Sequence, residues 1–127
     1  MLGGKQVAAM LAVRDLDVAR EFYGNVLGLT PVDESSEAIT YVSGGSAAIV
    51  YRSAYAGTNQ ATAAAWAAGD DFDAVLDELR AKGVTFEHYD DLPGMTREGD
   101  VHTMGPLRAA WLKDPDGNIL SIVDQAM

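Results

Sequence analysis

The sequence predicts an α+β fold made of two similar β-α-β-β-β modules, with approximate bounds at residues 5–53 and 61–125. Three observations lead to this prediction. Short apolar runs of strand length alternate with segments whose apolar residues recur at helical spacing. The order of these segments repeats once, with an offset of about 55 residues. A turn motif near the C-terminus joins the last two expected strands.

The first module begins with an apolar run at residues 6–13, which suits a strand buried on both faces. Asp15 is a good N-cap for the helix that follows, and Gly28 is placed to end that helix. The module then continues with three expected strands, at residues 30–33, 38–42 and 47–52.

The second module follows a small, polar connector at residues 53–60. A strand at residues 61–68, a helix capped by Asp70 or Asp71 and ended by Gly83, and a strand at residues 84–89 are expected. The segment Asp71-Phe72-Asp73-Ala74 corresponds to Asp15-Leu16-Asp17-Val18 of the first module. Residues 90–107 are expected to form a long loop, of the kind that often serves as a lid or binding loop.

The motif Lys113-Asp114-Pro115-Asp116-Gly117-Asn118 predicts a hairpin. One strand ends at residues 111–113, and the return strand covers residues 119–123. Pro115 fixes φ for the first central position of a type I turn, and Gly117 supplies a residue with positive φ.

Composition excludes several classes of protein. The 127 residues include 9 basic and 19 acidic residues, and a net charge of −10 argues against binding to nucleic acids or anionic membranes. The charge suits a cationic small-molecule ligand, although an acidic surface that only aids solubility is the simpler explanation. The absence of cysteine excludes disulfides and thiolate chemistry. No apolar run approaches the ~20 residues of a membrane span, and the N-terminal residues lack a secretory pattern, so we expect a cytoplasmic protein.

The chain resembles the vicinal oxygen chelate superfamily, which includes glyoxalase I, bleomycin and fosfomycin resistance proteins, and extradiol dioxygenases. The residues that carry the resemblance are Arg14-Asp15-Leu16, Glu21-Phe22-Tyr23, Val26-Leu27-Gly28-Leu29 and the motif at residues 113–118. The resemblance implies two curved mixed sheets around a cleft. In the enzymes of the group, His, Glu or Gln side chains from the first and last strands of the modules hold a divalent metal there. It also implies a homodimer, with the cleft built within one chain or across two.

The positions that correspond to these metal ligands carry no suitable side chain. The usual ligand spacing that the resemblance implies gives Ala8, Ile49, Ala64 and Ser121. Three of these residues have no ligand atom, and Ser121 offers only a neutral hydroxyl. A shift of one residue reaches only apolar neighbours. We therefore expect no metal at the usual site and no cofactor.

The two histidines are the remaining candidates for chemistry. His88 and Asp90 can share one face of the expected strand, although a solvated strand end is the simpler explanation. His102, in the expected long loop beside Asp100, is a weak candidate for an acid or base because its pKa lies near neutrality. The sequence contains no Gly-x-Ser-x-Gly elbow and no nucleotide-binding motif.

Strand alternation predicts which side chains face the cleft. Met10 and Ala12 share parity with Ala8, and Thr62 and Trp66 share parity with Ala64. Whether the side chains of Tyr51 and Trp111 also point into the cleft depends on the strand register. Such a cleft would be apolar and aromatic, and would suit a flat or hydrophobic small molecule. The candidate ligand-binding residues are Met10, Tyr51, Trp66, His102, Trp111 and Ser121.

Two functions follow from this interpretation. The first is a metal-independent binding protein of the bleomycin-resistance type, which holds a hydrophobic or aromatic, and in view of the charge a cationic, small molecule. The second is a glyoxalase- or dioxygenase-like lyase, isomerase or oxygenase with a displaced metal site. A third possibility is a structural domain whose cleft is filled by its own side chains.

Overall fold

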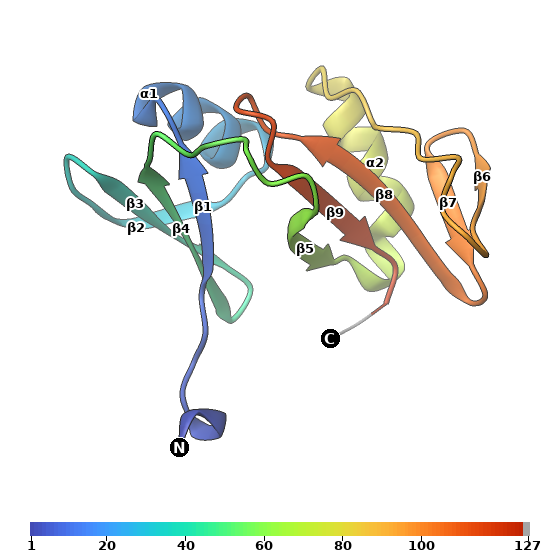
Figure 1. Ribbon diagram of the computed structural model, residues 1–127, viewed down its shortest axis with the longest axis horizontal. Helices are drawn as coiled ribbons and strands as arrows, with labels where there is room; N and C mark the ends of the chain where they lie inside the picture. The colour runs from blue at the N-terminus through green and yellow to red at the C-terminus, as the bar shows by residue number, and fades with distance from the viewer. Residues whose placement is uncertain (126–127) are drawn as a thin grey trace. The chain divides into compact units, whose positions relative to one another are not determined.

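The computed structural model describes residues 1–125, and it shows an α+β chain with one mixed sheet of four strands and one of five (Figure 1). The predicted fold class is therefore confirmed. The chain divides into two compact units. Met1–Asn59 and Pro115–Asn118 form unit 1, and, of the described residues, 60–114 and 119–125 form unit 2. No helix within residues 1–125 is long and apolar enough to cross a membrane.

Unit 1 contains the four-stranded sheet and one helical segment. Its sheet has the order β1-β4-β3-β2, in which β1 is parallel to β4 and the other pairs are antiparallel. The elements are a 3-10 turn (Leu2–Gly4), β1 (Ala9–Val13), α1 (Leu16–Ala19), a π-helical segment (Arg20–Val26), β2 (Thr30–Glu34), β3 (Ala38–Ser43) and β4 (Ser46–Arg52).

Asp15 starts the helical segment as the sequence predicts. Its Oδ1 accepts the backbone N–H groups of Asp17 at 2.8 Å and Val18 at 3.2 Å, which satisfies two donors of the first turn. The second half of the segment is π-helical rather than α-helical. The N–H of Leu27 accordingly donates to the carbonyl of Phe22, five residues earlier, at 2.9 Å. The apolar pattern of the sequence did not predict the π-helical part. Residues that are one and four positions apart face the core in an α-helix and in a π-helix alike.

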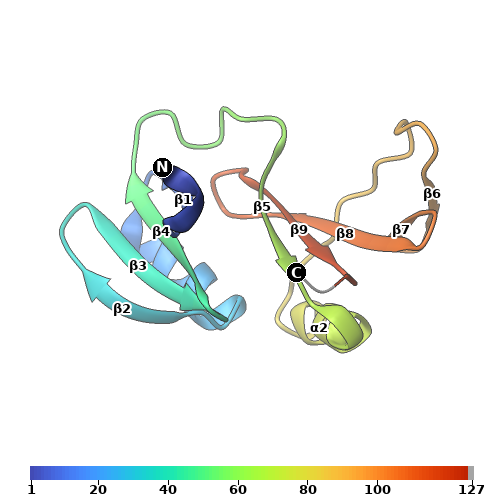
Figure 2. The same cartoon turned by 90° about the horizontal axis from the view of Figure 1, so that it is seen from below.

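One face of the unit 1 sheet packs against the helical segment (Figure 2). The rings of Tyr23 and Tyr41 lie 6.4 Å apart in this layer, and both side chains are buried. Leu11, Val13, Ile39 and Val50 fill the rest of it. The opposite face carries the alternate residues of the same strands, and these remain partly exposed.

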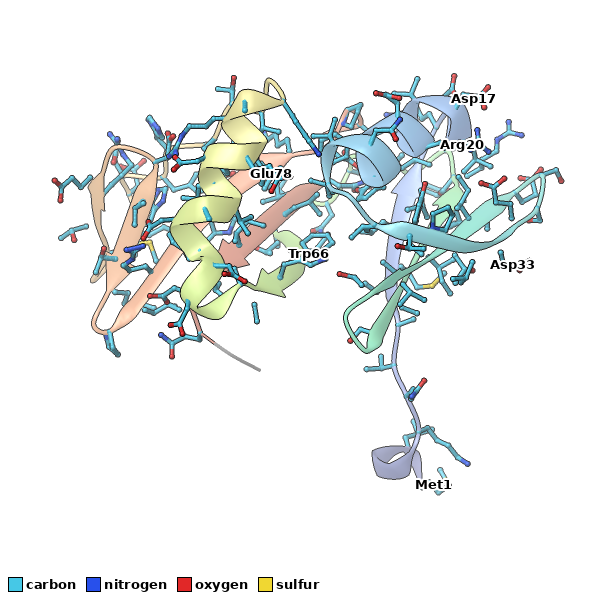
Figure 3. The ribbon with its side chains drawn as sticks, turned by 180° about the vertical axis from the view of Figure 1, so that it is seen from behind. Met1, Asp17, Arg20, Asp33, Trp66 and Glu78 are labelled. Carbon is cyan, nitrogen blue, oxygen red and sulfur yellow. The ribbon has the colours of Figure 1, made fainter. Side chains whose placement is uncertain are left out.

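Unit 2 contains the five-stranded sheet, with the order β5-β9-β8-β7-β6, and helix α2 covers one of its faces (Figures 1 and 3). Phe72, Leu76 and Leu79 of α2 are buried, as are Ala110, Leu112, Leu120 and Ile122 of the sheet. The elements are β5 (Thr62–Ala67), a 3-10 turn (Gly69–Asp71), α2 (Phe72–Ala81), β6 (Thr96–Glu98), β7 (Val101–Met104), β8 (Leu107–Lys113) and β9 (Ile119–Val123).

Two expectations for unit 2 are wrong. Residues 84–89 form no strand, and only an isolated bridge joins Glu87 to Trp111. Residues 90–107 are not a long loop, because they carry β6 and β7, which continue the antiparallel sheet. Gly99 and Gly105, with φ values of 61° and 58°, each open a two-residue turn between neighbouring strands. Glycine at the first position of such a turn is a recognised hairpin signal.

Candidate functional site

The sheet face opposite the helical segment brings together the candidate residues of unit 1. Met10 pairs with Ile49 and Ala12 pairs with Tyr51 across the parallel β1–β4 ladder, so these four side chains share one face. Met10 is 54% exposed on this face. Ala8 lies just before β1 and is half-buried. The alternation predicted for Met10 and Ala12 agrees with the register, and Tyr51 lies on the same face.

The register of unit 2 separates the two tryptophans. Ser121 pairs with Ala65 on one side and Trp111 on the other, whereas Trp66 pairs with Ile122. Trp66 therefore lies on the α2-covered face, and the expectation that it shares a face with Thr62 and Ser121 is wrong. The reason is a bulge in β5 between Thr62 and Ala64, which reverses the alternation at one residue. Ala64 consequently pairs with Leu120 and also lies on the α2-covered face.

Trp111 covers Ser121. Its indole N–H reaches across β9 and donates to Thr62 Oγ1 on β5 at 3.1 Å. Ser121, which lies between these strands, is only 3% exposed. The position that corresponds to the last-strand metal ligand is therefore a buried hydroxyl beneath an indole ring.

His102 supports Trp111 from the neighbouring strand. The two rings are 4.9 Å apart with an interplanar angle of 86°, and the Tyr89 ring lies 5.6 Å from Trp111 in a second edge-to-face contact. Nε2 of His102 accepts the backbone N–H of Tyr89 at 2.9 Å, so the neutral imidazole carries its proton on Nδ1. We call Tyr89, His102 and Trp111 the aromatic cluster.

The structure corrects the expectation that His102 is a loop residue available for acid–base chemistry. It lies on β7 and has no exposed surface. Burial lowers its pKa, and the positive charges of Arg97 and His88 act in the same direction. A neutral, enclosed imidazole that accepts a backbone hydrogen bond has a packing role.

His88 has different partners from those its sequence position indicated. Its Nε2 lies 2.8 Å from Asp100 Oδ1, and Arg80 of α2 donates to the same carboxylate at 2.9 Å. The hydrogen bond from His88, and then the contacts of Arg80, hold the pKa of Asp100 below its usual value despite partial burial. Asp90 instead pairs with Arg97 at 2.7 Å. Asp100 therefore ties the β6–β7 turn to α2 through Arg80 and to the segment at residues 84–89 through His88.

Comparison with known proteins identifies the family of this chain. The family model described as "Glyoxalase/Bleomycin resistance protein/Dioxygenase superfamily" matches residues 5–122. The chain belongs to this superfamily. A search among curated proteins found no match.

Solved structures of the superfamily share the fold at low sequence identity. A lactoylglutathione lyase from Agrobacterium tumefaciens is 18% identical, with 94% of this chain and 92% of that chain covered and a TM-score of 0.70. A fosfomycin resistance protein from Mesorhizobium loti is 15% identical, with 100% and 96% covered and a TM-score of 0.67. A glyoxalase/bleomycin resistance protein from a Streptomyces species is 18% identical, with 93% and 98% covered and a TM-score of 0.62.

The divalent metal of the superfamily's enzymes does not fit the residues of this member. Ala8, Ile49 and Ala64 have no donor atom, Ser121 is buried beneath Trp111, and the bulge turns Ala64 onto the α2-covered face. Thr62 and Ala65, which share the face of Ser121, add only one hydroxyl, and it already accepts the indole N–H. Within residues 1–125 no group of three His, Asp or Glu side chains is placed to hold a metal ion.

The sequence reasoning missed Tyr89, and it missed the role of His102 as a support for Trp111. The sequence offered only the alternation of Glu87 and Tyr89 in an expected strand; the bridge from Glu87 to Trp111, which places them on the face of Trp111, is seen only in the structure. The arginines beside the β1–β4 ladder, described below, were also missed. They gave no signal, because Arg14 and Arg52 are far apart in sequence and adjacent only through the parallel ladder.

Proposed function

We propose that this superfamily member is a small-molecule-binding protein of the bleomycin-resistance type, which holds a hydrophobic or aromatic ligand without a metal at the superfamily's usual positions. The observation that carries the proposal is the replacement of the metal-ligand side chains by alanine, isoleucine and a serine that Trp111 covers. A carbon-lined sheet face suits a ligand held by contact and stacking, because it supplies no Lewis acid and no strong base.

Each unit, taken by itself, offers candidate residues for ligand contact, and exposure distinguishes them. In unit 1, Met10 and Tyr51 lie on the uncovered face of the sheet. In unit 2, Trp111 and Tyr89 are the partly exposed members of the aromatic cluster. His102 holds the indole at a fixed angle from a fully buried position. The net charge of −10 favours a cationic ligand through long-range attraction. We also propose a homodimeric state.

The first experiment is native mass spectrometry of gently purified protein with and without chelator. It reports the oligomer, any bound metal and any retained organic molecule in one spectrum. A metal-free species carrying an organic adduct supports the proposal and gives the mass of the ligand. Stoichiometric metal that chelator removes would overturn it and would favour a glyoxalase- or dioxygenase-like enzyme.

The two tryptophans provide a matched pair of variants for the ligand so identified. Trp111→Phe should weaken binding about tenfold, since an aromatic contact and its fixed orientation contribute on the order of 1–1.5 kcal/mol. Trp66→Phe should leave binding unchanged, because Trp66 pairs with Ile122 on the α2-covered face. Equal effects of the two substitutions on the dissociation constant, measured by calorimetry, would contradict the assignment.

A further inference from the structure

Unit 1 contains a hollow lined by arginines that lies away from the positions discussed above. Its volume is about 420 Å³, and its walls carry the guanidinium groups of three arginines, two carboxylates and two hydroxyls: Arg14, Arg20, Arg52, Asp15, Asp17, Ser35 and Ser36. The Asp15 carboxylate is committed to the helix N-cap, and the Asp17 carboxylate pairs with Arg20. A second hollow of about 620 Å³ shares Arg14 and Arg52 with the first. Both volumes fall in the range of small-molecule sites. Three of the nine basic residues of a strongly acidic chain thus line one hollow.

The parallel β1–β4 ladder explains why two of these arginines meet. Val13, the last residue of β1, pairs with Arg52, the last residue of β4. Arg14 follows Val13 directly, so the side chains of Arg14 and Arg52 emerge beside one another at the carboxyl ends of two adjacent parallel strands. The ladder thus places two guanidinium groups at one edge of the unit 1 sheet.

The two guanidinium groups are only loosely paired within the described residues. Nη1 of Arg14 lies 3.5 Å from Asp116 Oδ1, and Nη1 of Arg52 lies 3.6 Å from Glu37 Oε1. Charge-assisted hydrogen bonds are normally about 2.7–2.9 Å long. The side chain of Arg52 is 54% exposed and that of Glu37 is 69% exposed, so the pair contributes little and an incoming anion can replace it.

The remaining polar groups of the hollow have defined roles. Arg20 and Asp17 lie close together on the helical segment (Figure 3). Arg20 is held by Glu34 at 3.3 Å and by Asp17 at 2.6 Å, and these carboxylates raise its pKa. Ser35 Oγ accepts the backbone N–H groups of Glu37 at 3.2 Å and Ala38 at 3.1 Å, which leaves its O–H available to donate. Arg14, Arg52 and Ser35 therefore supply the donors that are not committed to the fold.

We infer that this hollow, the Arg14–Arg52 site, binds the phosphate or carboxylate group of a small organic anion. Two guanidinium groups present planar, paired donors that match the oxygens of such a group. The exposed carboxylate of Glu37 occupies the position that the ligand's oxygens take over. This site is independent of the hydrophobic ligand proposed above, because it lies at the strand ends of unit 1 and not on its open sheet face.

The test is titration of the ¹⁵N-labelled full chain, followed by NMR, with inorganic phosphate, phenyl phosphate and acetate, each against sodium chloride at equal ionic strength. Saturable shifts that include Arg14, Ser35 and Arg52 are expected with at least one oxyanion. Tighter binding of the two phosphates identifies the ligand group as a phosphate, and tighter binding of acetate identifies it as a carboxylate. Shifts that chloride reproduces, or that fail to saturate with all three probes, would overturn the inference.

Three variants make the assignment specific. Arg52→Met should raise the dissociation constant about tenfold or more, because it removes a charged hydrogen-bond donor. Glu37→Gln should lower it, because the competing carboxylate is gone; a purely structural role for the Arg52–Glu37 pair does not predict this. Lys5→Met removes the same charge from an exposed position elsewhere in unit 1 and should change nothing. Equal weakening by Arg52→Met and Lys5→Met would refute the site.

Discussion

The close contact between Gly57 and the turn at residues 115–118 allows a quantitative test of how unit 1 is held together. Gly57 has a φ of +74°, and a Cβ atom placed there would lie 2.0 Å from the carbonyl oxygen and 3.1 Å from the carbonyl carbon of Asp116. Both of these atoms belong to the backbone, so no change of rotamer relieves the overlap. In Gly57→Ala, the connector or the turn has to move.

The expected loss of unfolding free energy in Gly57→Ala has two parts. A non-glycine residue with positive φ costs about 1–2 kcal/mol. Displacing the turn weakens the hydrogen bond from the Arg14 backbone N–H to Asp116 Oδ2, now 3.2 Å, and that from the Asn118 side chain to the Ala12 carbonyl, now 2.7 Å. Weakening these two bonds adds about 1–3 kcal/mol. We therefore expect Gly57→Ala to lower the free energy of unfolding by about 2–5 kcal/mol.

Gly28→Ala is the matched control. Gly28 lies in the same unit with a φ of +76°, and a Cβ there would meet no atom within 4 Å. This variant should lose only the free energy that a non-glycine residue with positive φ costs, about 1–2 kcal/mol. Urea unfolding followed by circular dichroism measures both free energies. Equal losses for the two variants would refute the reasoning, because they would show that the connector does not pack against the turn.

Two further predictions concern named side chains. Because burial lowers the pKa of His102, the unfolded chain binds a proton more readily, so the stability contributed by neutral His102 is complete above about pH 6.5 and is lost as the pH falls below that value. His102→Gln, which can still accept the Tyr89 N–H, should flatten this pH dependence; an unchanged slope of unfolding free energy between pH 7.5 and 5.5 would contradict the burial argument. Asp15→Ala should cost about 1 kcal/mol of stability through loss of the N-cap. Asp17→Ala, which removes a 91%-exposed carboxylate, should cost at most about 0.5 kcal/mol in the same urea experiment, and equal losses would argue against a capping role.

Local signals explain which parts of the site the sequence predicted. Ala8, Ile49 and Ser121 could be recognised as unsuited to metal binding because residue chemistry does not depend on register. Met10 and Ala12 could be assigned to one face because β1 is regular. Trp66 was assigned to the wrong face because the bulge at Thr62–Ala64 leaves no mark in a run of alanines. One inserted residue reverses all the side chains beyond it.

The sequence by itself determined the α+β class, the two-fold repeat of elements, the Asp15 cap and the chemistry missing from the superfamily's metal-ligand positions. These depend on composition, periodicity and spacing, which are local properties. Only the tertiary structure decided that Trp111 covers Ser121, that His102 is a buried support, and that Arg14 and Arg52 meet at the ends of two parallel strands. Each of these is a contact between side chains of neighbouring strands in a sheet. Such contacts depend on sheet register, which the backbone hydrogen bonds of the whole sheet set together.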